Sequence, residues 1–290
     1  MRHVHTPRCI GKTLLSISMI IAIMALLCVS EARAASIVPR PDHVVIVIEE
    51  NHPYNSIIGS PSAPYINKLA QSGALFTNAS AVAHPSEPNY LALFSGSTQG
   101  VSDDSCPHTF SGPDLGGNLL KANLSFGGYS ESLPHTGFIG CISPAIAPVY
   151  ARKHNPWVNF TDVPASANLP LSSFPASYDT LPTVSMVVPN LQNDMHDGTI
   201  QQGDSWLQAH INGYVNWANT HNSLLIVTWD EDNGTAANHI PTIMVGPMVK
   251  SGSYATAITH YSVLRTLEDM YGLPYANNSA SASPISGCWN

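Results

Sequence analysis

Short apolar runs bounded by polar and turn-forming residues recur along the chain, and they predict strands buried on both faces. The clearest run is Leu-Leu-Ile-Val-Thr-Trp at 224–229, which ends in three acids and an Asn-Gly turn. The predicted strands are 43–48, 74–80, 125–131, 183–188, 224–229 and 239–245.

Helical segments alternate with these strands. Predicted helices begin after Ser62, close to Ser86, after the capping residue Asp114, at Asp204 and at His260. The alternation predicts an α/β fold with a mostly parallel sheet and helices on both faces. Residues 132–182, rich in Pro, Ser and Asn, predict an irregular insertion that serves as a lid, and the tail from 276 is expected to be loose.

The N-terminus has the pattern of a secretory signal peptide at 1–34. Basic residues precede an apolar run at 14–29, and Ala32-Arg33-Ala34 follows as a cleavage signal. A retained anchor and a lipoprotein attached at Cys28 are the alternatives, and the short run and its flanks favour neither. We therefore expect a secreted protein, extracellular or periplasmic, with one domain at 35–290 and no stable membrane anchor after cleavage.

The net charge of the mature chain restricts the classes of partner that it can bind. After residue 34 the chain keeps seven Lys or Arg and eighteen Asp or Glu, a net charge of −11 with His neutral. This argues against nucleic-acid binding through a basic face.

Cys106 and Cys141 both lie in loop sequence and are expected to pair, which leaves Cys288 unpaired.

Polar side chains are expected to meet at one edge of the sheet, because the carboxyl ends of parallel strands lie together. They are Glu50, Asn51, Ser86, His196, Asp197, Asp230 and Glu231. Oxygen ligands from several strand ends suit a divalent cation, and a hydroxyl at a helix N-terminus suits a nucleophile attacking phosphorus. Each residue alone also fits an ordinary role as a cap, turn or solvated end. Their combination favours a site.

At these residues the chain resembles the bacterial phosphoesterase family, which joins secreted acid phosphatases and phospholipases C. The matching pieces follow family order across nearly the whole mature chain. They are Glu50-Asn51, 86–89, 152–156, 194–196, Asp230-Glu231 and 260–265. The resemblance implies an alkaline-phosphatase-like fold. Residues 84–90 and 193–198 are especially similar to secreted bacterial acid phosphatases that act on phosphatidylinositol 3-phosphate.

The resemblance also implies roles by position. The implied catalytic residues are Ser86 as nucleophile with His196 and His154. The implied substrate-binding residues are Asn89, Lys153 and His84. The implied metal ligands are Glu50, Asn51, Asp230 and Glu231, holding a divalent metal ion whose identity the sequence does not specify.

The resulting prediction is a secreted acid phosphatase that hydrolyses phosphomonoesters, phosphatidylinositol 3-phosphate among them, through a phosphoseryl intermediate. Arg152, Lys153 and His154 are expected to form a basic cluster in the lid that contacts phosphoinositide headgroups. The alternatives are a phospholipase C that acts on phosphodiesters, a sulfatase, and a noncatalytic secreted binding protein on the same scaffold.

Overall fold

The computed structural model describes residues 1, 3 and 38–290. The predicted signal peptide at 1–34 therefore lies outside the described residues, apart from Met1 and His3. Within the described part of the chain, no helix combines the length and apolar content needed to cross a bilayer.

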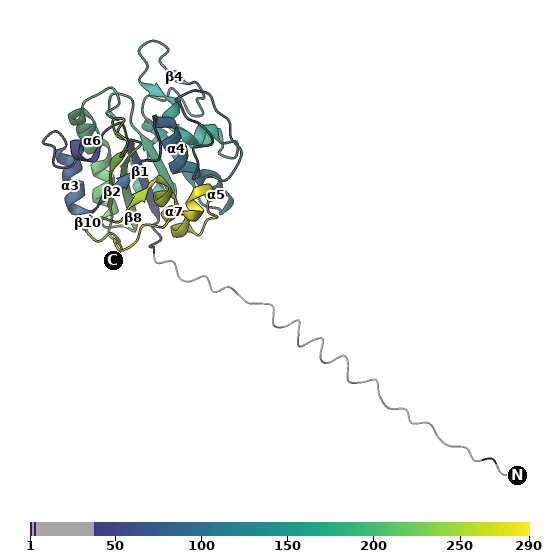
Figure 1. Cartoon of the computed structure of the whole chain (residues 1–290). Helices are drawn as coiled ribbons and strands as arrows, with labels where there is room; N and C mark the ends of the chain where they lie inside the picture. The colour runs from purple at the N-terminus through teal and green to yellow at the C-terminus, as the bar shows by residue number, and fades with distance from the viewer. Residues whose placement is uncertain (2, 4–37) are drawn as a thin grey trace. The chain divides into compact units, whose positions relative to one another are not determined.

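A nine-stranded sheet runs through residues 38–290 (Figure 1). Its order is β10 (Gly252–Tyr254), β2 (Ala74–Ser80), β9 (His239–Val245), β8 (Ser223–Trp229), β1 (His43–Glu49), β7 (Val184–Val188), β3 (Phe126–Ser130) and β6 (Asn168–Pro170), with β11 (Ile258–Thr259) also beside β2. Strand β9 runs antiparallel to β2 and β8, and the other pairs of this sheet are parallel. The predicted mostly parallel sheet is confirmed.

The central strands carry the core. All residues of β7 and β8 are buried, as are those of β1 after His43. This is why these strands read as continuous apolar runs. The β1–β8 register ends with Glu49 opposite Trp229, and β7 lies parallel to β1 on its other side. The next residues of β1 and β8, Glu50 and Asp230, are thereby brought together.

Two groups of helices cover the sheet (Figure 1). Helices α3 (Pro64–Ser72) and α6 (Ile200–Ala218) pack together, while α4 (Ser86–Ser95), α5 (Leu115–Lys121) and α7 (His260–Tyr271) form the second group. The remaining helical segments are α2 (Tyr54–Ile57) and the 3-10 turns Arg152–His154, Pro156–Asn159, Ala165–Ala167, Leu171–Ser173, Tyr178–Thr180 and Asn277–Ser281. The predicted cap of α5 is confirmed, since Asp114 accepts from Gly117 N.

The predicted start of α6 at Asp204 is wrong. The helix begins at Ile200, because the Thr199 hydroxyl accepts from Gln202 N and caps it. Asp204 lies inside α6, where its carboxylate accepts from Tyr65 N at 3.1 Å and Ile66 N at 2.8 Å. An acid that resembles a local cap therefore binds the first turn of α3, distant in sequence.

The lid and the tail are more ordered than the sequence predicts. Within 132–182, β6 extends the sheet, and β4 (Ile142–Ser143) and β5 (Tyr150–Ala151) form a hairpin. The prediction of a loose tail is wrong, because Ile285 and Cys288 are buried. Lys250 N also donates to Cys288 O at 2.8 Å, which ties the tail to the preceding chain.

The predicted disulfide is present. Cys106 and Cys141 are bonded with their Cα atoms 5.9 Å apart. The bond links the loop after α4 to the β4–β5 hairpin. Cys288 is free, as expected from the sequence, and it is buried.

Candidate active site

Hydrogen bonds hold the carboxyl ends of three parallel strands close together. Asp230 N donates to Glu49 O at 3.0 Å, and Asn51 N donates to the Asp230 carboxylate at 3.1 Å. From the loop after β7, Asp194 O accepts from Glu50 N at 2.7 Å. Asn51 has a φ of 54°, in the left-handed region that Asn tolerates better than most residues. The side chains of β1, β8 and the loop after β7 therefore meet at one edge.

Ser86 enters this edge from the first residue of α4, directly after Pro85. Its Oγ lies 3.2 Å from Glu50 Oε2 and 3.1 Å from Glu231 Oε1, and the side chain is buried. The hydroxyl can donate its proton to either carboxylate. Its place in the first turn of a ten-residue helix puts it where the helix dipole favours negative charge.

His154 contacts the other oxygen of Glu50. Its Nε2 is 3.0 Å from Glu50 Oε1, and its Nδ1 is 3.3 Å from Asp194 Oδ2. The imidazole stacks on the Tyr90 ring, with the centroids 5.0 Å apart, and the Tyr90 hydroxyl donates to Glu50 Oε1. Glu50 therefore bridges the serine side of the site and the histidine side.

His196 and Lys153 complete the histidine side. His196 N donates to Asp194 Oδ1 at 2.8 Å, and the His196 ring lies 2.8 Å from an Asp197 oxygen. Lys153 Nζ is 3.4 Å from His196 Nε2 and 2.8 Å from Asp104 Oδ2. A cation and an imidazole thus lie beside the buried acids, in an arrangement that could bind an anionic group.

Burial dominates the electrostatics. It raises the pKa of Glu50, which the Asp194 charge raises further, and it raises the pKa of Asp230, aided by Glu50 and Glu231. Burial also lowers the pKa of His154, with Lys153 and His196 adding to the effect. Carboxylates packed this closely are costly to ionise unless a positive charge compensates them.

The donor set fits a divalent cation. Asp230 Oδ2 is buried and has no hydrogen-bond partner among the described residues. Ser86 Oγ lies within hydrogen-bonding distance of Glu50 and Glu231, and these oxygen atoms match the hard ligands that Mg²⁺, Ca²⁺ or Mn²⁺ prefer. Ligand atoms of Glu50, His154 and His196 also lie within 4.8 Å of one another. That second set would suit a metal that accepts imidazole.

His84 lies at the mouth of the site. It contacts the Glu231 carboxylate through Nδ1, and its Nε2 lies 3.0 Å from Thr235 O. With Asn51, Glu231 and Asp232 it lines a cavity of about 460 Å³. Burial alone would lower the pKa of His84, but the hydrogen bond to Glu231 raises it overall. This cavity borders the strand end that carries Glu231.

Asn89 does not face this cavity with a free amide. Its Oδ1 accepts from Val82 N and Ala83 N, and its Nδ2 donates to Ala83 O and Pro85 O. These four bonds use the full hydrogen-bonding capacity of the side chain. In this structure Asn89 holds the loop that delivers Ser86.

The predicted basic cluster in the lid does not form as one surface. The Arg152 guanidinium is buried and donates to Asn159 Oδ1, Ile139 O and His108 O. His154 is buried as well. The expected basic cluster is therefore not available as one surface, because Arg152 donates to the backbone carbonyls of Ile139 and His108, and His154 is buried.

Three residues that the sequence interpretation did not assign to the site contribute to it: Tyr90, Asp194 and Asp104. Tyr90 lies one helical turn after Ser86, and Asp194 lies two residues before His196, so both spacings offered a signal. Asp104 lies in a Ser/Gly/Asp loop without a distinguishing pattern. Its carboxylate accepts from Glu87 N at 3.0 Å as well as from Lys153.

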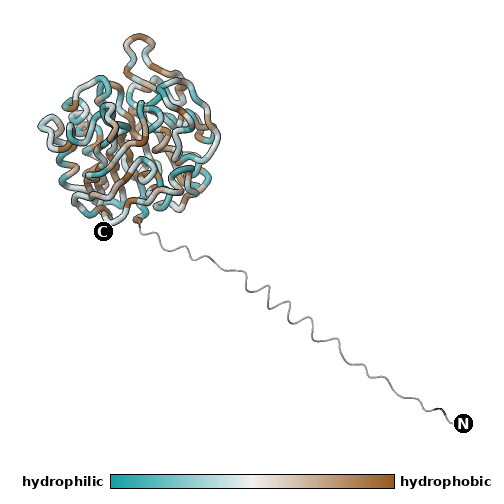
Figure 2. The backbone as a smooth tube through the Cα atoms, in the orientation of Figure 1, coloured by the Kyte–Doolittle hydropathy of each residue, from teal (hydrophilic) through white to brown (hydrophobic). Residues whose placement is uncertain are grey.

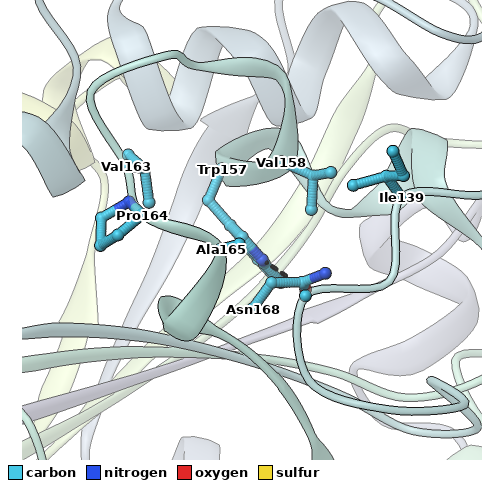
Figure 3. Close-up of a pocket in the computed structure, with 8 residues that line it drawn as sticks. Ile139, Trp157, Val158, Val163, Pro164, Ala165 and Asn168 are labelled. Atoms are coloured by element: carbon cyan, nitrogen blue, oxygen red, sulfur yellow. Dashed lines mark hydrogen bonds between the residues drawn. The ribbon is translucent and has the colours of Figure 1, made fainter.

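A second cavity of about 100 Å³ lies within the lid (Figure 3). Trp157, Val158 and Ile139 line it, and Trp157 Nε1 donates to Asn168 at 2.9 Å. None of the candidate residues lines this cavity. It belongs to the packing of the lid rather than to the strand-end site.

Known proteins share much of their sequence with this chain. Residues 60–274 match the Phosphoesterase family. The chain is 52% identical to a phosphatidylinositol-3-phosphatase of Mycobacterium tuberculosis, over 88% of this chain and 85% of that protein. It is 34% identical to a phosphate-repressible acid phosphatase of Penicillium chrysogenum, over 72% of this chain and 54% of that protein. The chain thus spans about half the length of this fungal relative.

Among solved structures, the chain is similar to a protein in the alkaline phosphatase superfamily from Vibrio parahaemolyticus. The TM-score is 0.57 at 13% identity, covering 87% of this chain and 72% of that one. At this identity the likeness concerns the fold, which is the alkaline-phosphatase-like arrangement expected from the sequence. On the family match and the identity to the mycobacterial enzyme, this chain belongs to the Phosphoesterase family.

Proposed function

We propose that this protein is a phosphoric monoester hydrolase, an acid phosphatase whose substrates include phosphatidylinositol 3-phosphate. The observation that carries the proposal is the position of the Ser86 hydroxyl, within 3.2 Å of carboxylates from two strand ends. The names of the mycobacterial and fungal relatives support the activity class. The pattern at 1–34 supports export of a catalytic domain at 35–290.

Ser86 is the proposed nucleophile. Its Oγ attacks phosphorus, forming an O–P bond while the bond to the leaving alcohol oxygen breaks, and water then hydrolyses the phosphoseryl intermediate. Glu50 and Glu231 can accept the hydroxyl proton, since both lie within hydrogen-bonding distance. The helix N-terminus favours the negative charge that develops.

Glu50, Asp230 and Glu231, with Asn51, are proposed to hold a divalent metal ion. Such an ion would lower the pKa of the serine hydroxyl and offset phosphate charge. The buried, unpartnered oxygen of Asp230 supports the assignment. Glu50 would also contact the histidine side through its other oxygen.

His196 and Lys153 are proposed to bind the phosphoryl oxygens, and His196 to protonate the leaving alcohol. Lys153 and His196 are partly exposed and adjacent, so a phosphate at the strand ends can reach both. His154, held between Glu50 and Asp194, orients the buried acids. His84 is proposed to contact substrate at the cavity mouth, and Asn89 to position the Ser86 loop.

Ser86→Ala tests the nucleophile. Turnover of an aryl phosphate should fall by at least about a thousandfold, because removing a covalent nucleophile costs several powers of ten. Ser205→Ala on the exposed face of α6 is the matched control and should keep full activity. Near-normal turnover by a folded Ser86→Ala variant would refute the assignment.

Metal and substrate class need separate measurements. Exhaustive chelation should abolish activity, and a single divalent ion should restore it. A panel of aryl phosphate, bis-aryl phosphodiester, phosphatidylcholine and phosphatidylinositol 3-phosphate then separates the candidates. Phosphate release from both monoesters supports the proposal, whereas faster cleavage of the diesters would establish a phospholipase C.

A further inference from the structure

Exposed large hydrophobic side chains are concentrated in the lid. Five such side chains occur in residues 38–290, and three of them lie within eight residues: Ile139, Ile142 and Ile146. Their exposed fractions are 68%, 47% and 87%. Isolated exposed apolar residues are ordinary on protein surfaces, but a cluster of this kind marks an interaction surface.

Ile142 and Ile146 are on the β4–β5 hairpin, which protrudes from the body of the protein, and Ile139 lies just before it (Figure 1). Figure 2 shows the tip of this loop as hydrophobic. No Asp, Glu, Lys or Arg occurs between 132 and 151, an uncharged run of twenty residues. The protruding element is therefore apolar and uncharged, which is the opposite of an ordinary solvated loop in a protein of net negative charge.

The base of the hairpin is firmly held. Cys141 is bonded to Cys106, Arg152 N donates to Cys141 O at 2.8 Å, and the Arg152 guanidinium donates to Ile139 O at 2.7 Å. The exposed isoleucines therefore lie on an element whose base is held by a disulfide and by hydrogen bonds. A hairpin fixed at its base keeps its tip in a defined orientation.

The hairpin is also continuous with the site. Strand β5 leads directly into Arg152–His154, and Lys153 and His154 contact the site residues. Val149 O accepts from Leu191 N at 2.8 Å, which joins the hairpin to the loop that carries His196. Whatever binds the hairpin tip is brought close to the side of the site proposed to hold phosphate.

We propose that the β4–β5 hairpin inserts Ile142 and Ile146 into the interfacial region of a lipid bilayer and so presents a lipid-borne phosphomonoester to Ser86. The inference rests on the proposed function and extends it to the way a membrane-embedded substrate is reached. Apolar side chains on a protruding element can bury in the headgroup and acyl boundary without spanning the membrane.

The net negative charge of the protein favours membrane binding through apolar side chains over binding through a basic surface. The mature chain carries a net charge of −11, the lid residues Arg152 and His154 are buried, and Lys153 is paired with Asp104. Attraction of a basic surface to anionic lipid is therefore weak, and insertion has to supply the affinity. A stable protein partner would need roughly 800 Å² of surface on each side, more than one small hairpin offers.

The test compares wild type with Ile142→Ser/Ile146→Ser on phosphatidylcholine vesicles that contain phosphatidylinositol 3-phosphate. Vesicle affinity, measured by flotation, should fall by roughly tenfold for each isoleucine. Hydrolysis of the embedded lipid should fall in parallel, while kcat/KM for a soluble aryl phosphate stays unchanged. Leu120→Ser removes an exposed apolar side chain elsewhere and should leave both measurements unchanged.

Binding that persists in high salt supports insertion, since screening weakens only charge-driven attachment. Equal vesicle affinity of wild type and the double variant would overturn the proposal. So would sedimentation that shows a wild-type dimer and a variant monomer, with neither binding vesicles. Absence of aryl phosphate turnover in wild type would instead refute the proposed function, and flotation would still decide the role of the hairpin.

Discussion

Replacing both Cys106 and Cys141 with serine measures how much one covalent link stabilises the fold around the site. The bonded residues are 35 positions apart. In the chain-entropy account, closing a loop of this length restricts the unfolded chain and stabilises the fold by about 4 kcal/mol at 25 °C. For a domain of this size the loss should lower Tm by roughly 10 °C.

Urea unfolding monitored by tryptophan fluorescence checks this value. Cys106→Ser alone should lose as much as the double variant, because one thiol cannot form the bond. A reductant should lower wild type to the level of the double variant and leave the variant unaffected. Cys288 is present in all of these proteins, so its contribution cancels. A loss of no more than about 0.5 kcal/mol, the usual range for surface substitutions, would contradict this value.

The other predictions concern pH and helix capping. Burial raises the pKa of Glu268 to about 7, so the folded state keeps a proton that the unfolded chain loses near its ordinary pKa, and stability falls as pH rises between those values. Unfolding at pH 5 and pH 8 should show that Glu268→Gln removes up to about 3 kcal/mol of this fall; identical pH dependence in both proteins would contradict it. Asp204→Ala should cost about 2–3 kcal/mol in urea unfolding, because two buried N–H groups of α3 lose their acceptor. The exposed control Gln208→Ala should change stability by less than about 0.5 kcal/mol, and an equal loss in both variants would argue against the capping role.

The local chemistry of the sequence determined the main strands and helices and which polar side chains follow the strand ends. Strand β8 can be predicted because a run of apolar residues must be buried wherever it lies. Asp114 can be predicted as a helix cap because its hydrogen-bond partner is three residues away. The acids that directly follow two of these strands lie close together because the two strands are parallel neighbours in the sheet. The resemblance to the Phosphoesterase family suggested which of these residues act as nucleophile, metal ligands and phosphate contacts.

Only the tertiary structure decided how individual polar side chains are used. Asp204 caps a helix 138 residues away, Arg152 is buried on carbonyls from distant loops, and Tyr90 donates to Glu50 across the site. In the sequence, a charged loop residue looks the same whether its side chain is exposed to solvent or hydrogen-bonded in the interior. Its partners are set by the packing of segments far apart in sequence, and no local pattern contains that information.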